Sequence, residues 1–540
     1  MLLSEVVAAS AEVARLPGRR DKIDVIAGLL ARVPAEEVPV AVAFLSGDLT
    51  QRQIGVGYAA LLGLPGPAEL AESLAGGGAD RPVLTLAQTD AAFAEIGALA
   101  GPGSQARRRE LLAGLVGRTT TGERRFLFRL LAGDLRQGAL EGVMTEAVAK
   151  AAGVPAGQVR RAHQLRGSLP EVARAALAAA GGGRPAVTAA LRAFTLTVGQ
   201  PVRPMLAASA PSVAAAFERI CPAAVEWKID GIRVQVHRQG DRVQVFTRTL
   251  DDITDRVPEI AALAGTLRAE SAVADGEAVA LRPDGRPQPF QVTSARVASQ
   301  SATPVPLTAF LFDLLHVDGA DLIDLPAAER FGRLASVAPA EALIPRLVTA
   351  DPAQAGEFFA DAIGRGHEGI VAKSLDAPYQ AGRRGSEWIK VKPRATLDLV
   401  ILAAEWGHGR RSGLLSNLHL GARDPAGGGF VMLGKTFKGL TDAMLAWQTG
   451  RLLELADPPG QAAAADPAAP DGGPGWRHGV VRVRPELVAE IAFDGVQASR
   501  RYPGGVTLRF ARVLRYREDK PAAEADTIEM VRALSPESSE

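Results

Sequence analysis

The 540-residue chain has a single cysteine, Cys221. One cysteine can form no intramolecular disulfide and cannot by itself build a cysteine-rich zinc site, which indicates a reducing compartment. Long hydrophobic runs are also missing: nowhere do about 18 apolar residues follow one another without a charge or a turn signal, so a membrane span is excluded. The positive charges near the N-terminus follow the apolar stretch, the reverse of a secretory signal. We therefore expect a cytoplasmic protein that does not enter a membrane.

Neither sign of charge dominates the chain. Because it has 61 basic and 60 acidic residues, any nucleic-acid partner would have to be held by local basic surfaces. Lysine is scarce: nine of the basic residues are lysine and all others are arginine. Arginine cannot give up its proton to become a nucleophile and cannot act as a compact point charge. The remaining lysines are therefore candidates for positions where arginine would fail.

Several domains are expected, since 47% hydrophobic and 22% charged residues exclude disorder throughout. Apolar side chains at helical spacing predict an all-α domain over 1–200. Alternating helix and strand patterns predict an α+β domain over 201–393, and 394–525 carries mainly strands, typical of a small β-barrel. A Pro-, Ala- and Gly-rich stretch near 457–475 predicts a disordered insertion, and 526–540 is expected to be a C-terminal tail.

The strand predictions rest on alternation of apolar residues. Val234 and Val236, then Val243 and Val245, flank a Gln-Gly-Asp turn and predict a hairpin. We also expect a helix at 353–365, apolar strand runs at 309–315 and 369–372, and further strands at 397–406, 415–424, 430–437 and 480–493.

The strongest local signal is Glu-Trp-Lys-Ile-Asp-Gly-Ile-Arg at 226–233. Lys228 stands between apolar Trp227 and Ile229 on a predicted strand, two residues before Asp230. We expect partial desolvation to lower its pKa from about 10.4 and to free a lone pair for attack. Lys-x-Asp-Gly alone covers only four positions, however, and a solvated lysine before a turn explains it equally well.

Further elements follow in order: Asp-Gly-Glu at 275–277, Phe-Leu-Phe-Asp-Leu-Leu at 310–315, Glu-Gly-Ile-Val-Ala-Lys at 368–373, Trp-Ile-Lys-Val-Lys-Pro at 388–393 and a terminal Arg-Glu-Asp-Lys at 517–520. Together with the Lys228 segment they resemble the covalent nucleotidyltransferase superfamily, specifically the ATP-dependent DNA ligases. The resemblance is specific over about 200–530 and loose before that. It implies a helical DNA-binding domain, an adenylation domain and an OB-fold barrel, and it makes Lys228 the residue that ATP adenylates.

Adenylation develops negative charge on phosphate oxygens and needs cations around them. Lys390 and Lys392 alternate along one predicted strand, which puts both ammonium groups on the same face. The resemblance makes them the clamp for the α-phosphate. Glu277 and Glu368 are hard oxygen ligands suited to Mg²⁺, the second cofactor that we expect beside ATP. For either glutamate alone, a solvated turn carboxylate is the competing interpretation.

The resemblance also places residues around adenosine and the DNA phosphate. Phe312 is similar to the adenine-stacking aromatic of the family, although core packing would bury this side chain as well. Glu226 is expected beside the ribose or the adenine. Arg233 and Arg248 match positions that contact the AMP sugar and the nick phosphate, and Arg384 is a weaker phosphate candidate. Ordinary surface cations are the competing interpretation for these arginines.

The terminal element lies on a separate body, the predicted barrel. The resemblance implies that Arg517, Asp519 and Lys520 orient the β- and γ-phosphates of ATP only when this barrel closes over the nucleotide. They would have to swing away before DNA could reach the adenylated lysine. Two conformations are therefore expected.

Two other cofactor assignments are weaker. Gly-x4-Gly-Lys-Thr at 429–436 matches the phosphate-loop pattern, but its four intervening residues are large and apolar and predict a barrel strand instead. An NAD-dependent DNA ligase would ordinarily bring a four-cysteine zinc site, which a single cysteine excludes. ATP is therefore the predicted nucleotide.

We expect an enzyme that seals 5′-phosphate/3′-hydroxyl nicks in duplex DNA. Its steps would be adenylation of Lys228, transfer of AMP to the 5′-phosphate, and attack of the 3′-hydroxyl with release of AMP. A monomer is expected, serving DNA repair, replication or recombination. The alternatives are an RNA ligase or capping guanylyltransferase, a phosphate-loop ATPase, and a catalytically inactive nucleic-acid-binding scaffold.

Overall fold

The computed structural model of the chain describes residues 1–51, 54–56, 82–133, 135, 137–139, 141–298, 305–380, 384–393, 395–407, 411–457 and 479–534. The chain divides into two compact units, which we call the first and the second unit. The first comprises Met1–Ala208, Arg219–Asp351 and Val371–Ile389, and the second comprises Ser209–Glu218, Pro352–Ile370 and Lys390–Glu540.

The domain boundaries remain predictions, because this division follows different lines. The boundary expected at residue 200 does not separate the two units, since the helical region and most of 201–393 fall together. The insertion predicted near 457–475 lies outside the described residues except for Asp457.

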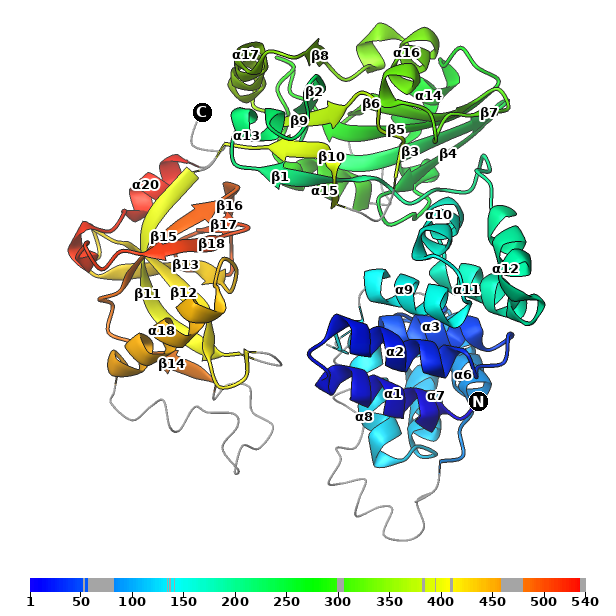
Figure 1. Cartoon of the computed structure of the whole chain (residues 1–540). Coiled ribbons are helices and arrows are strands. Elements are labelled where there is room, and N and C mark those ends of the chain that lie inside the picture. The colour runs from blue at the N-terminus through cyan, green and yellow to red at the C-terminus, as the bar shows by residue number, and fades with distance from the viewer. Residues whose placement is uncertain are drawn as a thin grey trace. The chain divides into compact units, whose positions relative to one another are not determined.

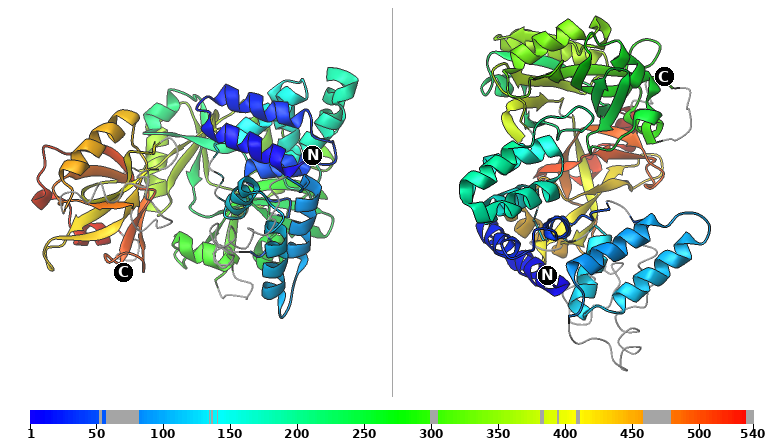
Figure 2. Two further views of the ribbon diagram at one scale, coloured as in Figure 1. Left: turned by 90° about the horizontal axis from the view of Figure 1, so that it is seen from below. Right: turned by 90° about the vertical axis from the view of Figure 1, so that its right-hand side faces the viewer.

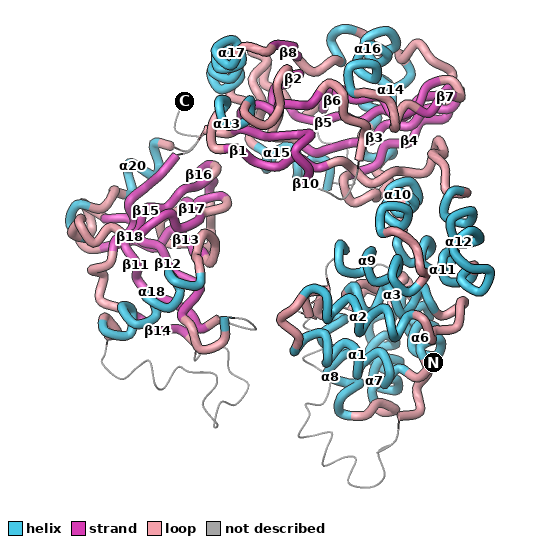
Figure 3. The backbone as a smooth tube through the Cα atoms, in the orientation of Figure 1, coloured by secondary structure: helices cyan, strands magenta, loops and turns pink. Residues whose placement is uncertain are grey.

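The described part of the first 192 residues is helical (Figures 1 and 3). Its α-helices are α1 (Leu3–Arg15), α2 (Arg19–Leu30), α3 (Val38–Ser46), α6 (Leu86–Ala98), α7 (Ser104–Val116), α8 (Thr121–Leu131), α9 (Glu141–Ala151), α10 (Ala156–Arg166), α11 (Leu169–Ala178) and α12 (Gly183–Arg192). Local chemistry explains where α8 begins: Thr120 and Glu123 form a reciprocal capping box that satisfies two free backbone N–H groups.

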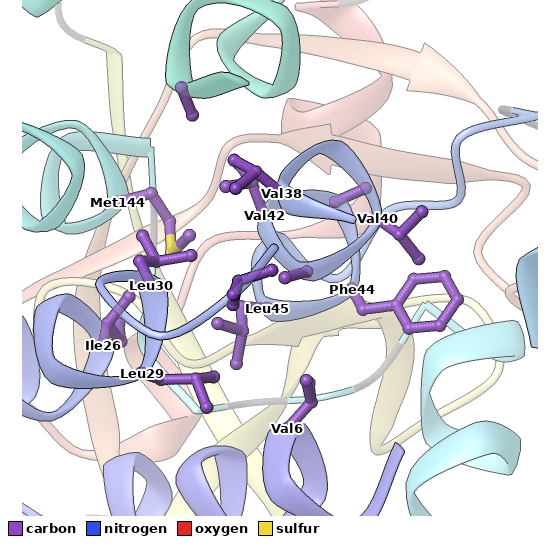
Figure 4. Packing of buried hydrophobic residues seen from close by; sticks show 14 of the residues in the cluster. Val6, Ile26, Leu29, Leu30, Val38, Val40, Val42, Phe44, Leu45 and Met144 are labelled. Carbon is purple, nitrogen blue, oxygen red and sulfur yellow. The ribbon is translucent and has the colours of Figure 1, made fainter. Parts of the chain in front are cut away.

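The core of the helical region surrounds α3 (Figure 4). All of Val38, Val42, Phe44 and Leu45 are buried, and α3 packs against α11 and α9. A helix that is apolar on every side must be enclosed by others, since no face can be left to water. This explains why the most hydrophobic helix of the region is buried among its neighbours. Figure 2 gives two further views of the helical region.

Residues 206–391 form an α+β region with two sheets. The first has the strand order β1 (Leu206–Ala210), β10 (Arg384–Val391), β9 (Gly369–Ser374), β2 (Ala223–Lys228), β8 (Arg346–Thr349). The second has the order β4 (Arg242–Thr247), β3 (Ile232–Gln239), β5 (Ser271–Ala280), β6 (Leu307–Val317), β7 (Ala320–Asp321), and its strands pair antiparallel. The accompanying helices are α13 (Val213–Phe217), α14 (Pro258–Gly265), α15 (Phe290–Ala298), α16 (Ala327–Val337) and α17 (Pro352–Gly364).

The alternation of the second sheet places two different surroundings on its two faces. Val234, Val236 and Ala274 belong to a core that α14 and α16 complete. Val273 and Phe312 belong to another core, which contains buried aromatic side chains. The predicted hairpin is confirmed as β3 and β4, and Gly240 turns between them with a φ of +57°. The strand predicted at 309–315 lies within β6.

Residues after 394 form an OB-like β-sheet domain. Its main sheet has the order β13 (Phe430–Thr436), β12 (Leu415–Arg423), β11 (Ala395–Trp406), β15 (Val488–Phe493), β18 (Arg512–Tyr516), and β14 (Val480–Arg482) pairs with β11. A separate pair joins β16 (Gly495–Ala498) and β17 (Val506–Arg509), and α18 (Asp442–Glu454) packs on β12. The rejected phosphate-loop match is a strand, as expected, because it forms β13.

The expected C-terminal tail begins with an ordered helix, α20 (Ile528–Ala533). Its Ile528 and Val531 are buried in the core of the OB-like domain. The described part of the tail is therefore packed structure. Within the described ranges, no helix is long and apolar enough to cross a membrane.

Candidate active site

Lys228 is the last residue of β2, and its side chain is half-buried. The turn that follows is tight: a Cβ atom on Gly231 would lie 2.2 Å from the carbonyl oxygen of Ala278 on β5. Only glycine lets β3 begin so close to β5, which gives the glycine of Lys-x-Asp-Gly a structural reason. Lys228 also lies within electrostatic reach of Glu277 on β5. The strand end thus brings the predicted nucleophile near a predicted metal ligand.

Glu277 is half-buried on β5, directly opposite Arg233 of β3. Burial raises the pKa of its carboxyl group to about 7, even though Lys228 and Arg233 act in the opposite direction. Because burial disfavours the charged form of this carboxylate, an added cation would stabilise that form strongly.

Arg233 is held on all sides by protein. Its Nε and Nη2 donate to the two carboxylate oxygens of Asp275 at 3.0 and 2.5 Å, and its Nη1 donates to the main-chain oxygen of Met205 at 2.5 Å. The ring centroids of Phe312 and Trp388 lie 5.4 and 5.5 Å from its Cζ. Burial acts to lower the pKa of Arg233, but Asp275, Tyr379 and Glu277 together outweigh it and the pKa is raised.

Tyr379 completes this arrangement. Its hydroxyl donates to Asp275 at 2.6 Å and accepts from Nη2 of Arg233 at 3.1 Å. The main-chain oxygen of Tyr379 accepts from the side-chain amide of Gln164 on α10 at 2.8 Å. The guanidinium that we expected to face the AMP sugar and the nick phosphate is therefore fixed by protein partners.

Glu226 is only 2% exposed, and two cations enclose its carboxylate. Arg346 donates from Nε and Nη2 to Oε1 at 2.8 and 2.6 Å, and Nζ of Lys373 lies 2.6 Å from Oε2. The pairing of β2 with β8 places Glu226 opposite Arg346. Because Arg346 and Lys373 already pair with this carboxylate, Glu226 holds these two side chains in place. The expected contact of Glu226 with ribose or adenine stays a prediction.

Phe312 lies in the core, 9% exposed, with the ring of Trp388 edge-on at 6.0 Å between centroids. Nζ of Lys373 lies 4.3 Å from the Phe312 centroid, which is cation–π distance. Arg346 donates to the main-chain oxygen of Phe312 at 2.8 Å. Core packing thus accounts for most of its surroundings, and adenine stacking stays a prediction.

Arg248 is exposed in the turn after β4. It lines a small pocket together with Arg233, Thr247 and Asp275, so the structure brings two of the predicted phosphate-binding arginines to one place. Arg384 begins β10, but its side chain lies outside the described residues.

In the second unit, Lys392 and Glu368 are joined by an ion pair of 2.8 Å. Lys392 also lies 3.1 Å from Asp494. Burial acts to lower the pKa of Lys392, but the two carboxylates outweigh it and the pKa is raised. Lys390 lies on β10 and is half-buried. Of the two lysines expected to clamp the α-phosphate, Lys392 is therefore held by carboxylates.

The cations of the terminal element meet on one carboxylate. Nη1 of Arg517 and Nζ of Lys520 lie 2.8 and 2.9 Å from the same oxygen, Oδ2 of Asp398 on β11. Arg517 also pairs with Asp519, with Nη2 at 2.8 Å. The structure thus brings together the two cations expected to orient the β- and γ-phosphates.

The expected Mg²⁺ can be tested against these donors. Among the described residues, no three His, Cys, Asp or Glu side chains gather into a metal cluster. Mg²⁺ does not need such a cluster, because it keeps several waters and binds through one or two carboxylates plus substrate phosphates. Glu277 fits the ion, since burial disfavours its negative charge and a bound cation would compensate for that. Glu368 fits only if it releases Lys392.

Some residues that hold these side chains in place were not predicted as site residues: Asp275, Arg346, Lys373, Tyr379 and Asp398. Asp275 and Lys373 lie inside segments that carry the resemblance, and the scarcity of lysine also marks Lys373. Tyr379 and Arg346 had no signal, because their partners lie 104 and 120 positions away in the sequence.

The fold defines the class first. An α+β adenylation domain with a lysine at the end of a strand, followed by an OB-like sheet domain, is a multidomain ligase-like architecture. A solved structure titled "Pmar-Lig_PreS3" shares this fold, with a TM-score of 0.60 and 16% identity, over 95% of this chain and 99% of that one.

Three family descriptions match the chain: "DNA ligase N terminus" at 68–149, "ATP dependent DNA ligase domain" at 204–392 and "ATP dependent DNA ligase C terminal region" at 411–520. A "Probable DNA ligase" of Mycobacterium sp. (strain KMS) is 57% identical over 540 residues, covering 99% of both chains. Another, of Mycolicibacterium gilvum (strain PYR-GCK), is 54% identical over 539 residues with the same coverage. The chain belongs to the ATP-dependent DNA ligase family, and the resemblance is confirmed.

Proposed function

We propose that this ligase seals 5′-phosphate/3′-hydroxyl nicks in duplex DNA and that Lys228 is the residue it adenylates. The observation that carries the assignment is the place of Lys228: a half-buried amine at a strand end, within electrostatic reach of a carboxylate whose pKa burial raises to about 7. A nucleophilic lysine must be held at a defined place beside the group that it attacks, and the end of β2 fixes the main chain of Lys228.

The first step forms one bond and breaks another. The neutral amine of Lys228 attacks the α-phosphorus of ATP, a phosphoramidate bond forms, and pyrophosphate leaves with the electron pair of the broken bond. In the second step the 5′-phosphate of the nick displaces the lysine and takes AMP. In the third step the 3′-hydroxyl attacks that phosphate, and AMP leaves. Each step needs in-line positioning and neutralised phosphate charge.

The side chains of the first unit would provide a fixed surface for the nucleotide. Arg233 cannot shift without breaking its pair with Asp275, so it supplies a positive charge at a constant place. Glu226 and Phe312 would shape the pocket for the base, and Arg248, on the rim of the small pocket, is the accessible arginine for a nick phosphate. Arg384 is proposed as a further phosphate contact.

The cations of the second unit would contact the phosphates. Lys390 and Lys392 would hold the α-phosphate, and Lys392 would exchange Glu368 and Asp494 for phosphate oxygen. Arg517 and Lys520 would hold the departing pyrophosphate. Bound Mg²⁺ would neutralise developing phosphate charge, and Glu277 and, once released from Lys392, Glu368 are each proposed as a ligand.

The helical region would hold the duplex. Helices that contact phosphates and sugars fix the register of a protein on DNA without reading its sequence. We therefore propose binding with little sequence preference, by a monomer in the cytoplasm. DNA repair, replication and recombination all produce nicks that such an enzyme could close.

A nick-sealing assay tests the proposal. The full chain is incubated with Mg²⁺ and ATP, NAD or GTP on singly nicked DNA and on a matched RNA substrate. We expect the DNA to be sealed when ATP is supplied with Mg²⁺, and not when NAD or GTP replaces ATP. Sealing of the RNA substrate only would favour an RNA ligase. Release of phosphate without sealing would favour an ATPase. If neither sealing nor phosphate release is observed, a catalytically inactive binding scaffold is favoured.

A further inference from the structure

Asp398 brings together two cations from the far end of the sequence. It lies on β11, while Arg517 and Lys520 lie 119 and 122 positions later, after β18. Both cations reach the same carboxylate oxygen, at 2.8 and 2.9 Å, and the Asp398 side chain is only 13% exposed. Two donors that converge on one oxygen must lie close to each other, although like charges repel.

The carboxylate of Asp398 stands on a rigid base. β11 pairs with β15, where Asp398 lies directly opposite Glu490. Its main chain is also fixed from another side, since its N–H donates to the carboxylate of Asp526 at 2.7 Å and its carbonyl oxygen accepts from the N–H of Asp526 at 2.9 Å. A carboxylate on so constrained a strand fixes the side chains that bind it.

Both cations can still bind a phosphate. An ammonium group has three N–H donors, and Lys520 gives one of them to Asp398. Arg517 gives Nη1 to Asp398, and its Nε and Nη2 to Asp519, whose side chain is 64% exposed. Because phosphate can replace so exposed a partner as Asp519, Asp398 can stay in place while phosphate binds.

We infer that Asp398 is a positioning residue for adenylation. Resting on the proposed function, it holds Arg517 and Lys520 side by side, so that both reach the pyrophosphate end of ATP together. Without its charge the two cations repel each other, and two long side chains must be ordered during nucleotide binding. Asp398 does not touch the nucleotide, and sealing of a nick that already carries AMP does not need it, because no triphosphate takes part.

The test uses the full chain and separates the steps. Asp398→Asn keeps the shape of the side chain and removes its charge. One assay measures the rate of self-adenylation against ATP concentration, and the other measures sealing of a nick adenylated beforehand. We expect the KM for ATP to rise about tenfold, the scale of one lost charge-assisted contact, while sealing stays within about twofold. Asp398→Glu should recover part of the loss.

Glu490→Gln is the matched control. Glu490 is the cross-strand neighbour of Asp398 and pairs with Arg515 at 2.7 Å, outside the predicted phosphate-binding set. Glu490 also attracts Arg517 weakly, so this variant should change the KM for ATP by less than about twofold and leave the sealing of the adenylated nick unchanged. If Glu490→Gln raises the KM for ATP as much as Asp398→Asn, a general charge effect replaces the specific role of Asp398.

Three further outcomes decide the inference. An unchanged or lower KM for ATP in Asp398→Asn contradicts it, and so do equal losses in both assays, which would show a structural role. In the double variant Asp398→Asn with Lys520→Met, the rise in the KM for ATP should be smaller than the product of the two single-variant rises, because both substitutions disrupt the same pair of cations. A wild-type chain that fails to adenylate itself refutes the proposed function instead, so the two failures are distinguishable.

Discussion

Within the candidate site, the Arg233–Asp275 pair of the first unit and the carboxylate partners of the second unit's cations differ in how far water can reach them. In the first unit, Asp275 is 1% exposed and its partner Arg233 15% exposed, and aromatic rings lie beside the guanidinium. In the second unit, Lys392 and Asp494 are 18% and 26% exposed, and Asp519 beside Arg517 is 64% exposed. A buried pair is hard to break, whereas an accessible one exchanges partners readily. The first unit therefore offers a fixed surface, and the second offers cations that can exchange carboxylates for phosphates.

Lys228→Arg should have the largest effect on activity. A guanidinium is not nucleophilic at neutral pH, so self-adenylation should fall to the background of the assay while the fold persists. Transfer of label from α-labelled ATP to the protein measures this, and circular dichroism checks the fold. Label at wild-type levels would remove Lys228 from the mechanism.

Asp275→Asn should have the largest effect on stability. It leaves the Arg233 charge buried without a full partner, and breaking such pairs costs about 3–5 kcal/mol. Urea unfolding should show a clearly lower midpoint at an unchanged slope. A loss of unfolding free energy below about 1 kcal/mol is typical of exposed ion pairs. It would mean that the Arg233–Asp275 pair is held no more firmly than the accessible pairs of the second unit.

The pH dependence of Glu277 gives a smaller effect. Burial raises its pKa from 4.5 to about 7, so the folded chain binds a proton more tightly than the unfolded chain does. The contribution of Glu277 to stability should therefore fall as the pH rises from about 4.5 to about 7, and should level off above that. Unfolding of the wild type and of Glu277→Gln across this range measures it.

The same protonation should affect the metal. Because Mg²⁺ binds the charged carboxylate, the Mg²⁺ concentration needed for self-adenylation should fall as the pH rises through 7. A requirement that does not change with pH would contradict the role of Glu277 as a ligand.

Glu490→Gln should have the smallest effect. Its partner Arg515 is 63% exposed, and exposed pairs contribute about 0–1 kcal/mol. The urea midpoint should stay close to that of the wild type. A loss as large as that of Asp275→Asn would erase the difference between the two units.

Much of the fold could be predicted from local patterns in the sequence. The hairpin of β3 and β4 follows from alternation and turn residues, and β13 follows from a run of large apolar residues, and both patterns depend on near neighbours. The described part of the predicted tail is a packed helix, because Val531 is buried in the core of the OB-like domain, a contact that no local pattern records.

The candidate site divides in the same way. The glycine after Lys228 had a sequence signal, since a turn requires it, but its close approach to Ala278 became visible only in the fold. Asp398 had no signal, because a lone aspartate in an apolar strand gains meaning only when Arg517 and Lys520 are brought to it. Residues that act on each other across long separations must be found in three dimensions.

Peptide mass spectrometry of the purified full chain, after exposure to ATP and Mg²⁺, tests the central claim most directly. The account predicts one adenylyl group, attached to the side chain of Lys228. A chain that carries no adenylyl group, or carries it on another residue, would contradict it.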